Sequence, residues 1–114
     1  YLLDLKVIIF TTIMYCRLRI SATSEKEAEK ISKSLVEKKL VAGIMIYKGK
    51  CHYWWAGKIT EKMYWNIGGF SLIKHKQAII DEGRKQHSDK CPIVAFNEID
   101  GNEDFLMWIK DSVL

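Results

Sequence analysis

The sequence predicts an α+β fold with one antiparallel sheet, helices on one face of that sheet, a long β-hairpin and a short C-terminal helix. Three observations predict it. A strand-like alternation at residues 16–22 leads into an amphipathic helix, two long β-favouring runs at residues 40–55 and 59–70 flank a glycine, and a further helix and strand precede a final helical segment. The 114 residues suffice for one domain with one packed core.

The segment CRLRISA alternates apolar and polar side chains, with Cys16, Leu18 and Ile20 on one side, as expected of a half-buried strand. Ser24 and Glu27 then have the spacing of a capping box, in which each side chain bonds a free backbone N–H of the first helical turn. We therefore expect a helix from this point to about residue 38.

The two runs that follow are apolar, aromatic and rich in β-favouring residues, and the tripeptide AGK lies between them. Gly57 supplies the turn geometry that a residue with a Cβ adopts only at a cost. We expect Gly68 and Gly69 to end the second arm or to form a bulge. Ser71 then becomes the expected cap of the second helix.

The segment CPIVAFNEI reads as a fourth strand, because Pro92 is acceptable as the first residue of a strand. Asn102 is the expected cap of the last helix, in which Phe105, Trp108 and Ile109 form the expected buried stripe. The predicted order is strand, helix, strand, strand, helix, strand, helix. This is the split βαβ, or ferredoxin-like, arrangement.

Residues 1–15 form an apolar segment before the expected domain, which spans residues 16–114. The segment is too short, and too interrupted by Asp4 and Lys6, for a membrane span of about 20 residues. We interpret it as an extra strand or an arm that packs on a partner, with a secretory signal as the alternative. The three widely spaced cysteines do not fit a disulfide-stapled secreted domain, so we expect a cytoplasmic location.

The net charge of +4 is compatible with a nucleic acid or an acidic ligand as partner, but it is too slight to indicate either. The sequence contains no GxSxG, HExxH or P-loop motif, so we expect no enzymatic activity. RNA-recognition domains share the predicted strand order and stack bases on sheet aromatics. The segment KMYWNIGGF does not fit their basic motif, so we expect no nucleic-acid partner.

Cysteine and histidine side chains suggest two candidate metal sites. Cys51 and His52 are soft ligands for copper or zinc, but neighbouring strand residues point to opposite faces and cannot easily hold one ion. His87 and Cys91 are better placed, because a four-residue separation in a loop lets both side chains bend inward. A third ligand has to come from elsewhere in the chain or from another subunit.

Aromatic residues occur on both arms of the predicted hairpin, and cross-strand ring pairing is the simplest interpretation. Alternation places Tyr53 and Trp55 on one face and Trp54 on the other. Because helices cover only one face of the predicted sheet, we expect a partner subunit to cover the other.

Four features occur together in a specific order: SEKEAEKISKSLVEKKLVAG, the turn YWWAGKI, the spacing of His87 and Pro92 to each other and to that turn, and the ending GNEDFLMWI. In these features the chain from about residue 16 to residue 114 resembles the CutA divalent-cation tolerance proteins. The resemblance implies a small ferredoxin-like subunit that forms a tight homotrimer through its hairpin. It further implies tolerance to divalent metal ions such as copper, or sensing of a small ligand, in clefts between subunits.

The resemblance also implies roles for individual residues. Trp55, Lys58 and His87 are the implied ligand-binding residues, and His87 with Cys91 is the candidate metal pair. Trp55 and Trp108 are expected to pack. Several polar cleft residues of the family are replaced, including those at Gly43, Ala56 and Ile93. The resemblance implies copper or another divalent cation as the ligand. The replaced cleft residues are the reason for the alternative, a trimeric interaction module that has lost metal binding.

Overall fold

The computed structural model describes residues 13–114. The elements are β1 (Tyr15–Ala22), α2 (Glu25–Glu37), β2 (Gly43–Trp55), β3 (Lys58–Leu72), the 3-10 turn η1 (Ile73–His75), α3 (Lys76–Gln86), β4 (Val94–Ile99) and α4 (Glu103–Val113). Of the segment at residues 1–15, expected to be an extra strand, an arm or a signal, residues 1–12 lie outside the described residues. Strand β1 begins at Tyr15, one residue before the expected start of the domain.

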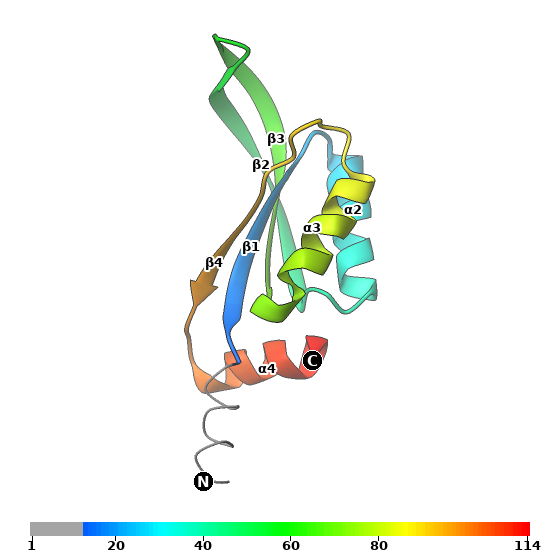
Figure 1. The fold of residues 1–114 in the computed structure, drawn as a ribbon, viewed down its shortest axis with the longest axis vertical. Helices are drawn as coiled ribbons and strands as arrows, with labels where there is room; N and C mark the ends of the chain where they lie inside the picture. Colours follow the sequence, from blue (N-terminus) through cyan, green and yellow to red (C-terminus); the bar gives the residue numbers. More distant parts are fainter. Residues whose placement is uncertain (1–12) are drawn as a thin grey trace, which may run out of the picture.

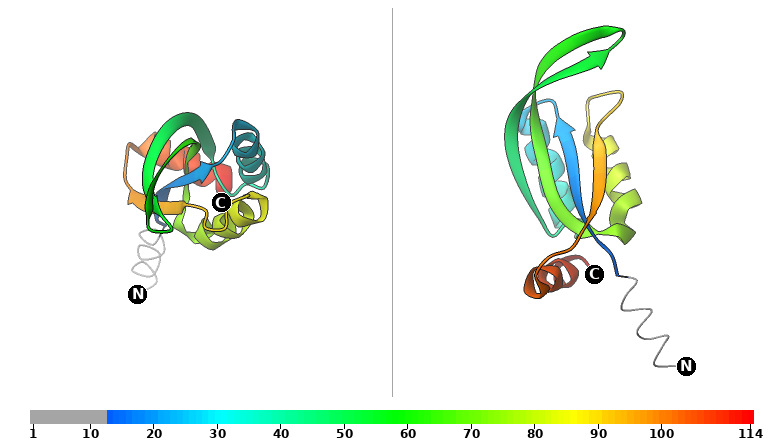
Figure 2. Two further views of the ribbon diagram at one scale, coloured as in Figure 1. Left: turned by 90° about the horizontal axis from the view of Figure 1, so that it is seen from above. Right: turned by 90° about the vertical axis from the view of Figure 1, so that its left-hand side faces the viewer.

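One antiparallel sheet with the strand order β2-β3-β1-β4 organises the chain. Helices α2 and α3 cover one face of this sheet, and α4 lies across its lower end (Figure 1). The views in Figure 2 show the same separation of sheet and helices. The predicted ferredoxin-like arrangement is confirmed.

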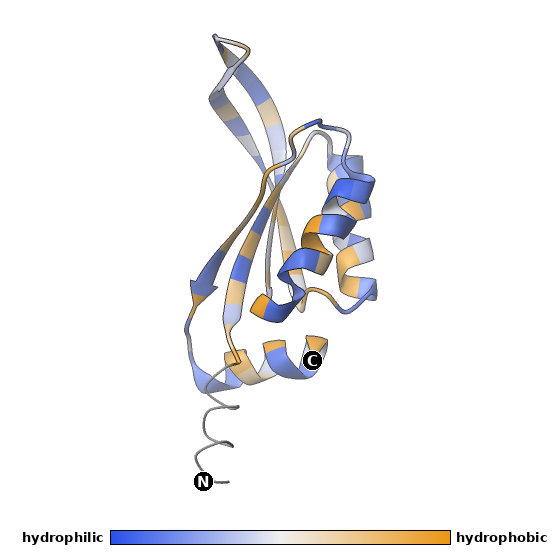
Figure 3. Ribbon diagram, viewed as in Figure 1, coloured by the Kyte–Doolittle hydropathy of each residue, from blue (hydrophilic) through white to orange (hydrophobic). Residues whose placement is uncertain are grey.

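The core lies between the sheet and helices α2 and α3. The apolar residues of β1 expected on one side are fully buried there, as are apolar residues of both helices: Leu18, Ile20, Ala28, Ile31, Leu35 and Ile79. Figure 3 shows hydrophobic segments where the helices approach the sheet and hydrophilic ones on their outer sides. Burial of each large aliphatic side chain contributes about 1.5–3 kcal/mol to stability. This energy holds the two helices on one face of the sheet, and the opposite face remains open.

One of the two hydrogen bonds of the predicted capping box is present at the start of α2. The Glu27 backbone N–H donates to Ser24 Oγ at 3.1 Å. The Glu27 carboxylate, however, accepts from the Thr23 backbone N–H at 2.7 Å, one residue before the cap. The carboxylate is thereby directed toward a distant loop that forms part of the candidate site described below.

The expected end of the second hairpin arm at Gly68 and Gly69 is wrong. Both glycines pair with β2 and β1, and β3 continues to Leu72. A Cβ at Gly69 would lie 2.8 Å from the Gly43 carbonyl oxygen, so glycine there allows close strand packing. Ser71 is a strand residue whose hydroxyl donates to the Leu40 carbonyl at 2.5 Å, so it does not cap α3, which begins only at Lys76.

Three smaller predictions near the C-terminus are also corrected. Strand β4 begins at Val94, not at Pro92. Asn102 occupies the cap position of α4, but its side chain makes no cap hydrogen bond and donates to the Asp104 carboxylate. Trp108 is 46% exposed, because Ile109 and Val113 face the core in its place.

The β2–β3 hairpin projects beyond the helices (Figure 1) and makes the molecule elongated, with extents of 57 × 29 × 25 Å. Trp55 pairs with Lys58, and the two residues between them form the turn. Both have positive φ, 50° at Ala56 and 76° at Gly57, as a type I′ hairpin turn requires. The turn role predicted for Gly57 is thus confirmed.

Candidate functional site

A cavity of about 580 Å³ lies between the hairpin and the loop that joins α3 to β4. The hairpin contributes Cys51, His52, Tyr53, Trp55, Lys62 and Tyr64, and the loop contributes Ser88, Asp89, Lys90, Cys91 and Ile93, with Ser21 of β1 completing the lining. The volume is within the range of cavities that bind small molecules.

Two tyrosines from opposite arms of the hairpin meet in this cavity. The hydroxyls of Tyr53 and Tyr64 are 3.2 Å apart, and their rings pack edge to face with centroids separated by 6.0 Å. The Lys62 ammonium lies 5.1 Å from the centroid of the Tyr64 ring. Burial, and then the hydrogen bond between Tyr64 and Tyr53, raise the pKa of Tyr64 above its ordinary value, so its hydroxyl remains protonated at neutral pH.

His87 holds the start of the loop against β1. Its Nδ1 accepts from the Asp89 backbone N–H at 3.0 Å, so Nε2 carries the proton and donates to the Ser21 carbonyl at 2.6 Å. Both ring nitrogens are therefore engaged in hydrogen bonds. To bind a metal ion or a ligand, His87 has to give up one of them.

Glu27 fastens the same loop to the start of α2. Its carboxylate accepts from the Ser88 backbone N–H at 2.7 Å and from the Thr23 hydroxyl at 2.8 Å, in addition to the Thr23 backbone N–H. Burial by itself raises the pKa of Glu27, but these hydrogen bonds outweigh it and hold the pKa at about 2. The ionised carboxylate thus stabilises one wall of the cavity at neutral pH.

The structure brings together only some of the residues predicted from the sequence. Trp55 and Cys91 line the cavity, and Trp55 is 55% exposed rather than packed within the described chain. Lys58 is exposed beside the hairpin turn, and neither Lys58 nor His87 is among the residues that line the cavity. The ligand roles of Trp55, Lys58 and His87, and the metal role of His87 with Cys91, remain predictions.

The sequence reasoning missed the residues that the fold adds to the cavity. It placed Cys51 and His52 on opposite faces of a strand, yet both line the cavity, together with the distant Cys91. Lys62 and Tyr64 were not singled out as ligand contacts. The aromatic alternation of the hairpin was the one signal that could have found Tyr64, since it predicts an aromatic face shared with Tyr53.

No group of three or more histidine, cysteine or acidic side chains within residues 13–114 is arranged to hold a metal ion. His52 Nε2 lies 3.7 Å from the Glu61 carboxylate. Cys51 and Cys91 are both free thiols that line the cavity. These two thiols and the imidazole of His52 are the groups of the lining that a soft metal ion could reach.

The family model described as CutA1 divalent ion tolerance protein matches residues 16–112. The chain belongs to the CutA family. This CutA chain is 35% identical over 95 residues to the divalent-cation tolerance protein CutA of Archaeoglobus fulgidus, across 82% of this chain and 93% of that protein. It is 25% identical over 92 residues to the protein of the same description from Thermotoga maritima, across 80% and 91% of the two chains.

Solved CutA structures have the same fold. The structure of the periplasmic divalent cation tolerance protein CutA from Archaeoglobus fulgidus matches with a TM-score of 0.86 at 33% identity, covering 89% of this chain and all (100%) of that one. CutA1 from Oryza sativa matches with a TM-score of 0.86 at 22% identity, covering 91% and 97% of the two chains, and supports the fold alone. Among the described residues of this CutA chain, no helix combines the length and apolar character needed to span a membrane.

Proposed function

We propose that this CutA-family chain is a homotrimer without enzymatic activity. In the proposal, the trimer acts in tolerance to divalent metal ions such as copper, or in sensing a small ligand, at clefts between its subunits. The family membership supports the tolerance role, because the relatives above are described as divalent-cation tolerance proteins. The open face of the sheet supports the assembly.

The open face is the observation on which the trimer depends. Residues 44 and 46 of β2 pack against the core, so the alternate residues of that strand point away from the helices. On this side Met45 is 72% exposed and Tyr47 is 50% exposed. A patch of this kind on a long edge strand is typical of a surface that associates with another subunit.

Sedimentation equilibrium tests the assembly. We expect a mass of about 40 kDa at micromolar concentration, three times the 13.3 kDa of one chain. Tyr47→Lys places a charge on the open face and should yield monomers. Val36→Lys is the matched control, because Val36 is exposed on α2 and should leave the mass unchanged. A wild-type monomer at this concentration contradicts the proposal.

Metal titration of the same samples tests the metal role. We expect Cu(I) and Cu(II) to bind the trimer, and Cys91→Ser to weaken the binding, because thiolates favour soft ions. His87→Ala should weaken binding only if the imidazole leaves its hydrogen bonds to Ser21 and Asp89. Unchanged copper binding in both variants contradicts the assignment of this pair.

The alternative function is a trimeric interaction module that has lost metal binding. It is favoured by the lack of a preformed group of three metal-ligating side chains among residues 13–114. A trimer that is purified without metal and takes up no copper at micromolar concentration supports this alternative. A cytoplasmic location also remains part of the proposal, although one CutA relative is described as periplasmic.

A further inference from the structure

The charged groups that line the cavity are predominantly basic. Lys62 and Lys90 contribute ammonium groups, and Asp89 contributes the one carboxylate of the lining. The ion pairs among residues 13–114 involve neither lysine. The lining therefore favours an anion over a cation, and each lysine can approach a bound oxygen without breaking an existing ion pair.

The tyrosine pair provides a hydrogen-bond donor in the same place. Two phenol hydroxyls carry two protons, and the bond between Tyr53 and Tyr64 uses only one of them. Only 8% of the surface of Tyr64 is exposed. The second proton is available to an acceptor oxygen that enters the cavity, and because the phenol stays neutral it does not repel an anion.

Aromatic surface forms the remaining part of the cavity. The rings of Tyr53 and Tyr64 and the half-exposed indole of Trp55 all line it. Flat rings stack or pack edge to face on such side chains, with about 0.5–1.5 kcal/mol per pair beyond the burial of area. A ligand that has both an aromatic ring and an oxyanion matches the two halves of this lining.

We propose that the cavity binds a flat organic anion, namely an aromatic ring that carries a carboxylate or a phosphate group. The oxyanion lies near Lys62 and Lys90 and accepts a hydrogen bond from the tyrosine pair, while the ring packs beside Trp55. This inference deepens the proposed function, on which it rests for the role of a small ligand at this cleft.

Calorimetric titration of the full chain in its own assembly with four probes tests the ligand class. The first two probes are 2-naphthoate and 2-naphthyl phosphate, which share the ring and differ in the oxyanion. The other two are 2-naphthamide, which lacks the charge, and cyclohexanecarboxylate, which lacks the aromatic ring. We expect each of the two naphthyl anions to bind at least about tenfold more tightly than either control. The tighter of the two anions shows whether the cavity prefers a carboxylate or a phosphate.

Substitutions place the binding in this cavity. Lys62→Gln should weaken naphthoate binding about tenfold, and Tyr53→Phe, which keeps the ring and removes the hydroxyl, about fivefold. Lys48→Gln is the matched control. The Lys48 ammonium also lies over an aromatic ring of the hairpin, 5.5 Å from the centroid of Trp65, but Lys48 does not line the cavity. Its substitution should change the affinity less than about twofold.

Three results overturn the inference: no binding of either naphthyl anion at millimolar concentration, equal binding of 2-naphthamide and 2-naphthoate, or equal weakening by Lys48→Gln and Lys62→Gln. These results are distinguishable from failure of the proposed function. A trimeric mass with copper uptake but no naphthoate binding refutes the ligand class alone. Naphthoate binding that depends on Lys62 in a protein of monomeric mass, or in one that takes up no copper, refutes the trimer or the metal role and leaves the ligand class in place.

Discussion

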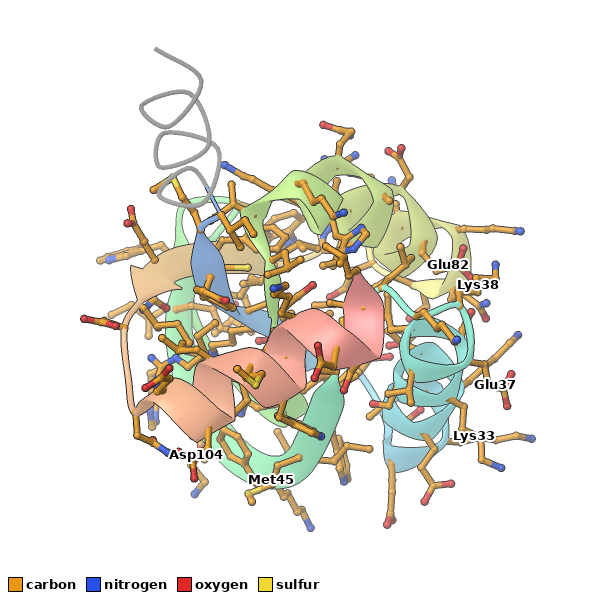
Figure 4. The ribbon with its side chains drawn as sticks, turned by 90° about the horizontal axis from the view of Figure 1, so that it is seen from below. Lys33, Glu37, Lys38, Met45, Glu82 and Asp104 are labelled. Atoms are coloured by element: carbon orange, nitrogen blue, oxygen red, sulfur yellow. The ribbon has the colours of Figure 1, made fainter. Side chains whose placement is uncertain are left out.

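Replacement of Glu82 by glutamine should remove a pH-dependent part of the stability. Glu82 lies in α3 with only 8% of its surface exposed, and its carboxylate meets α2 (Figure 4). It accepts from Lys38 Nζ at 2.8 Å, from the Ser34 hydroxyl at 2.5 Å and from the Gln86 side-chain amide at 3.1 Å. These hydrogen bonds, that from Lys38 first, lower the pKa of Glu82 from 4.5 to about 2.

The shift in pKa sets an upper limit on the contribution. A difference of about 2.5 between unfolded and folded pKa corresponds to about 3.4 kcal/mol. We reduce this to about 2 kcal/mol, because the Lys38 side chain is 49% exposed and water screens its charge. Since the folded pKa lies below the unfolded one, this stability is fully present above about pH 4.5 and is lost as the pH falls toward about 2.

Denaturant unfolding followed by far-UV circular dichroism, at one protomer concentration, measures the effect. Glu82→Gln should lower the free energy of unfolding by about 2 kcal/mol near pH 7, and the difference from wild type should shrink toward zero near about pH 2. Asp81→Asn is the matched control, because Asp81 is exposed on the same helix and, among residues 13–114, its carboxylate accepts from Gln77 alone, at 3.0 Å. A loss of equal size at both pH values refutes the electrostatic reasoning, since it indicates packing instead.

Three further substitutions probe the loop, the turn and the strand contact. Glu27→Gln should lower the unfolding free energy by about 1 kcal/mol above about pH 4.5, because the folded pKa of about 2 lies below the unfolded pKa. The substitution should also speed amide hydrogen exchange at Ser88, whose N–H donates to the Glu27 carboxylate. A wild-type exchange rate at Ser88 contradicts the anchoring role. Gly57→Ala should lower the unfolding free energy by about 1–2 kcal/mol, because φ is 76° at this position and a residue with a Cβ is strained there. An unchanged denaturation midpoint argues against this strain. Gly69→Ala should lower the unfolding free energy by about 2–3 kcal/mol in the same denaturation assay. Gly68→Ala should lower it much less, because a Cβ at Gly68 would lie 3.6 Å from its nearest neighbour, the Tyr47 ring. Equal losses in the two variants exclude the close contact at Gly69 as the cause.

Local signals in the sequence determined much of the fold. The alternation in β1, the cap at Ser24 and the turn at Gly57 each depend on residues within a few positions of one another. Their geometry follows from backbone dihedrals and nearby hydrogen bonds, so a linear pattern contains them. The order of these patterns also led to the CutA family, which the family model then confirmed.

The length of β3 depended on partners that are distant in the sequence. Ser71 has the local preference of a helix cap, but its hydroxyl bonds to the carbonyl of Leu40, 31 positions away. Pairing with both β1 and β2 carries the strand through its two glycines to Phe70, and pairing with β1 extends it to Leu72. Local propensity is weak compared with a filled ladder of hydrogen bonds, so the tertiary structure prevailed.

The candidate site shows most clearly what the sequence determined and what the tertiary structure decided. The sequence by itself determined which side chains are available: aromatic rings and a thiol on a hairpin, and a histidine and a second thiol in a loop. Only the tertiary structure decided that Cys51, Lys62 and Cys91 line one cavity and that both nitrogens of His87 are already bonded. The physical reason is that strand twist and loop anchoring act through space, where separation along the chain carries no information about distance.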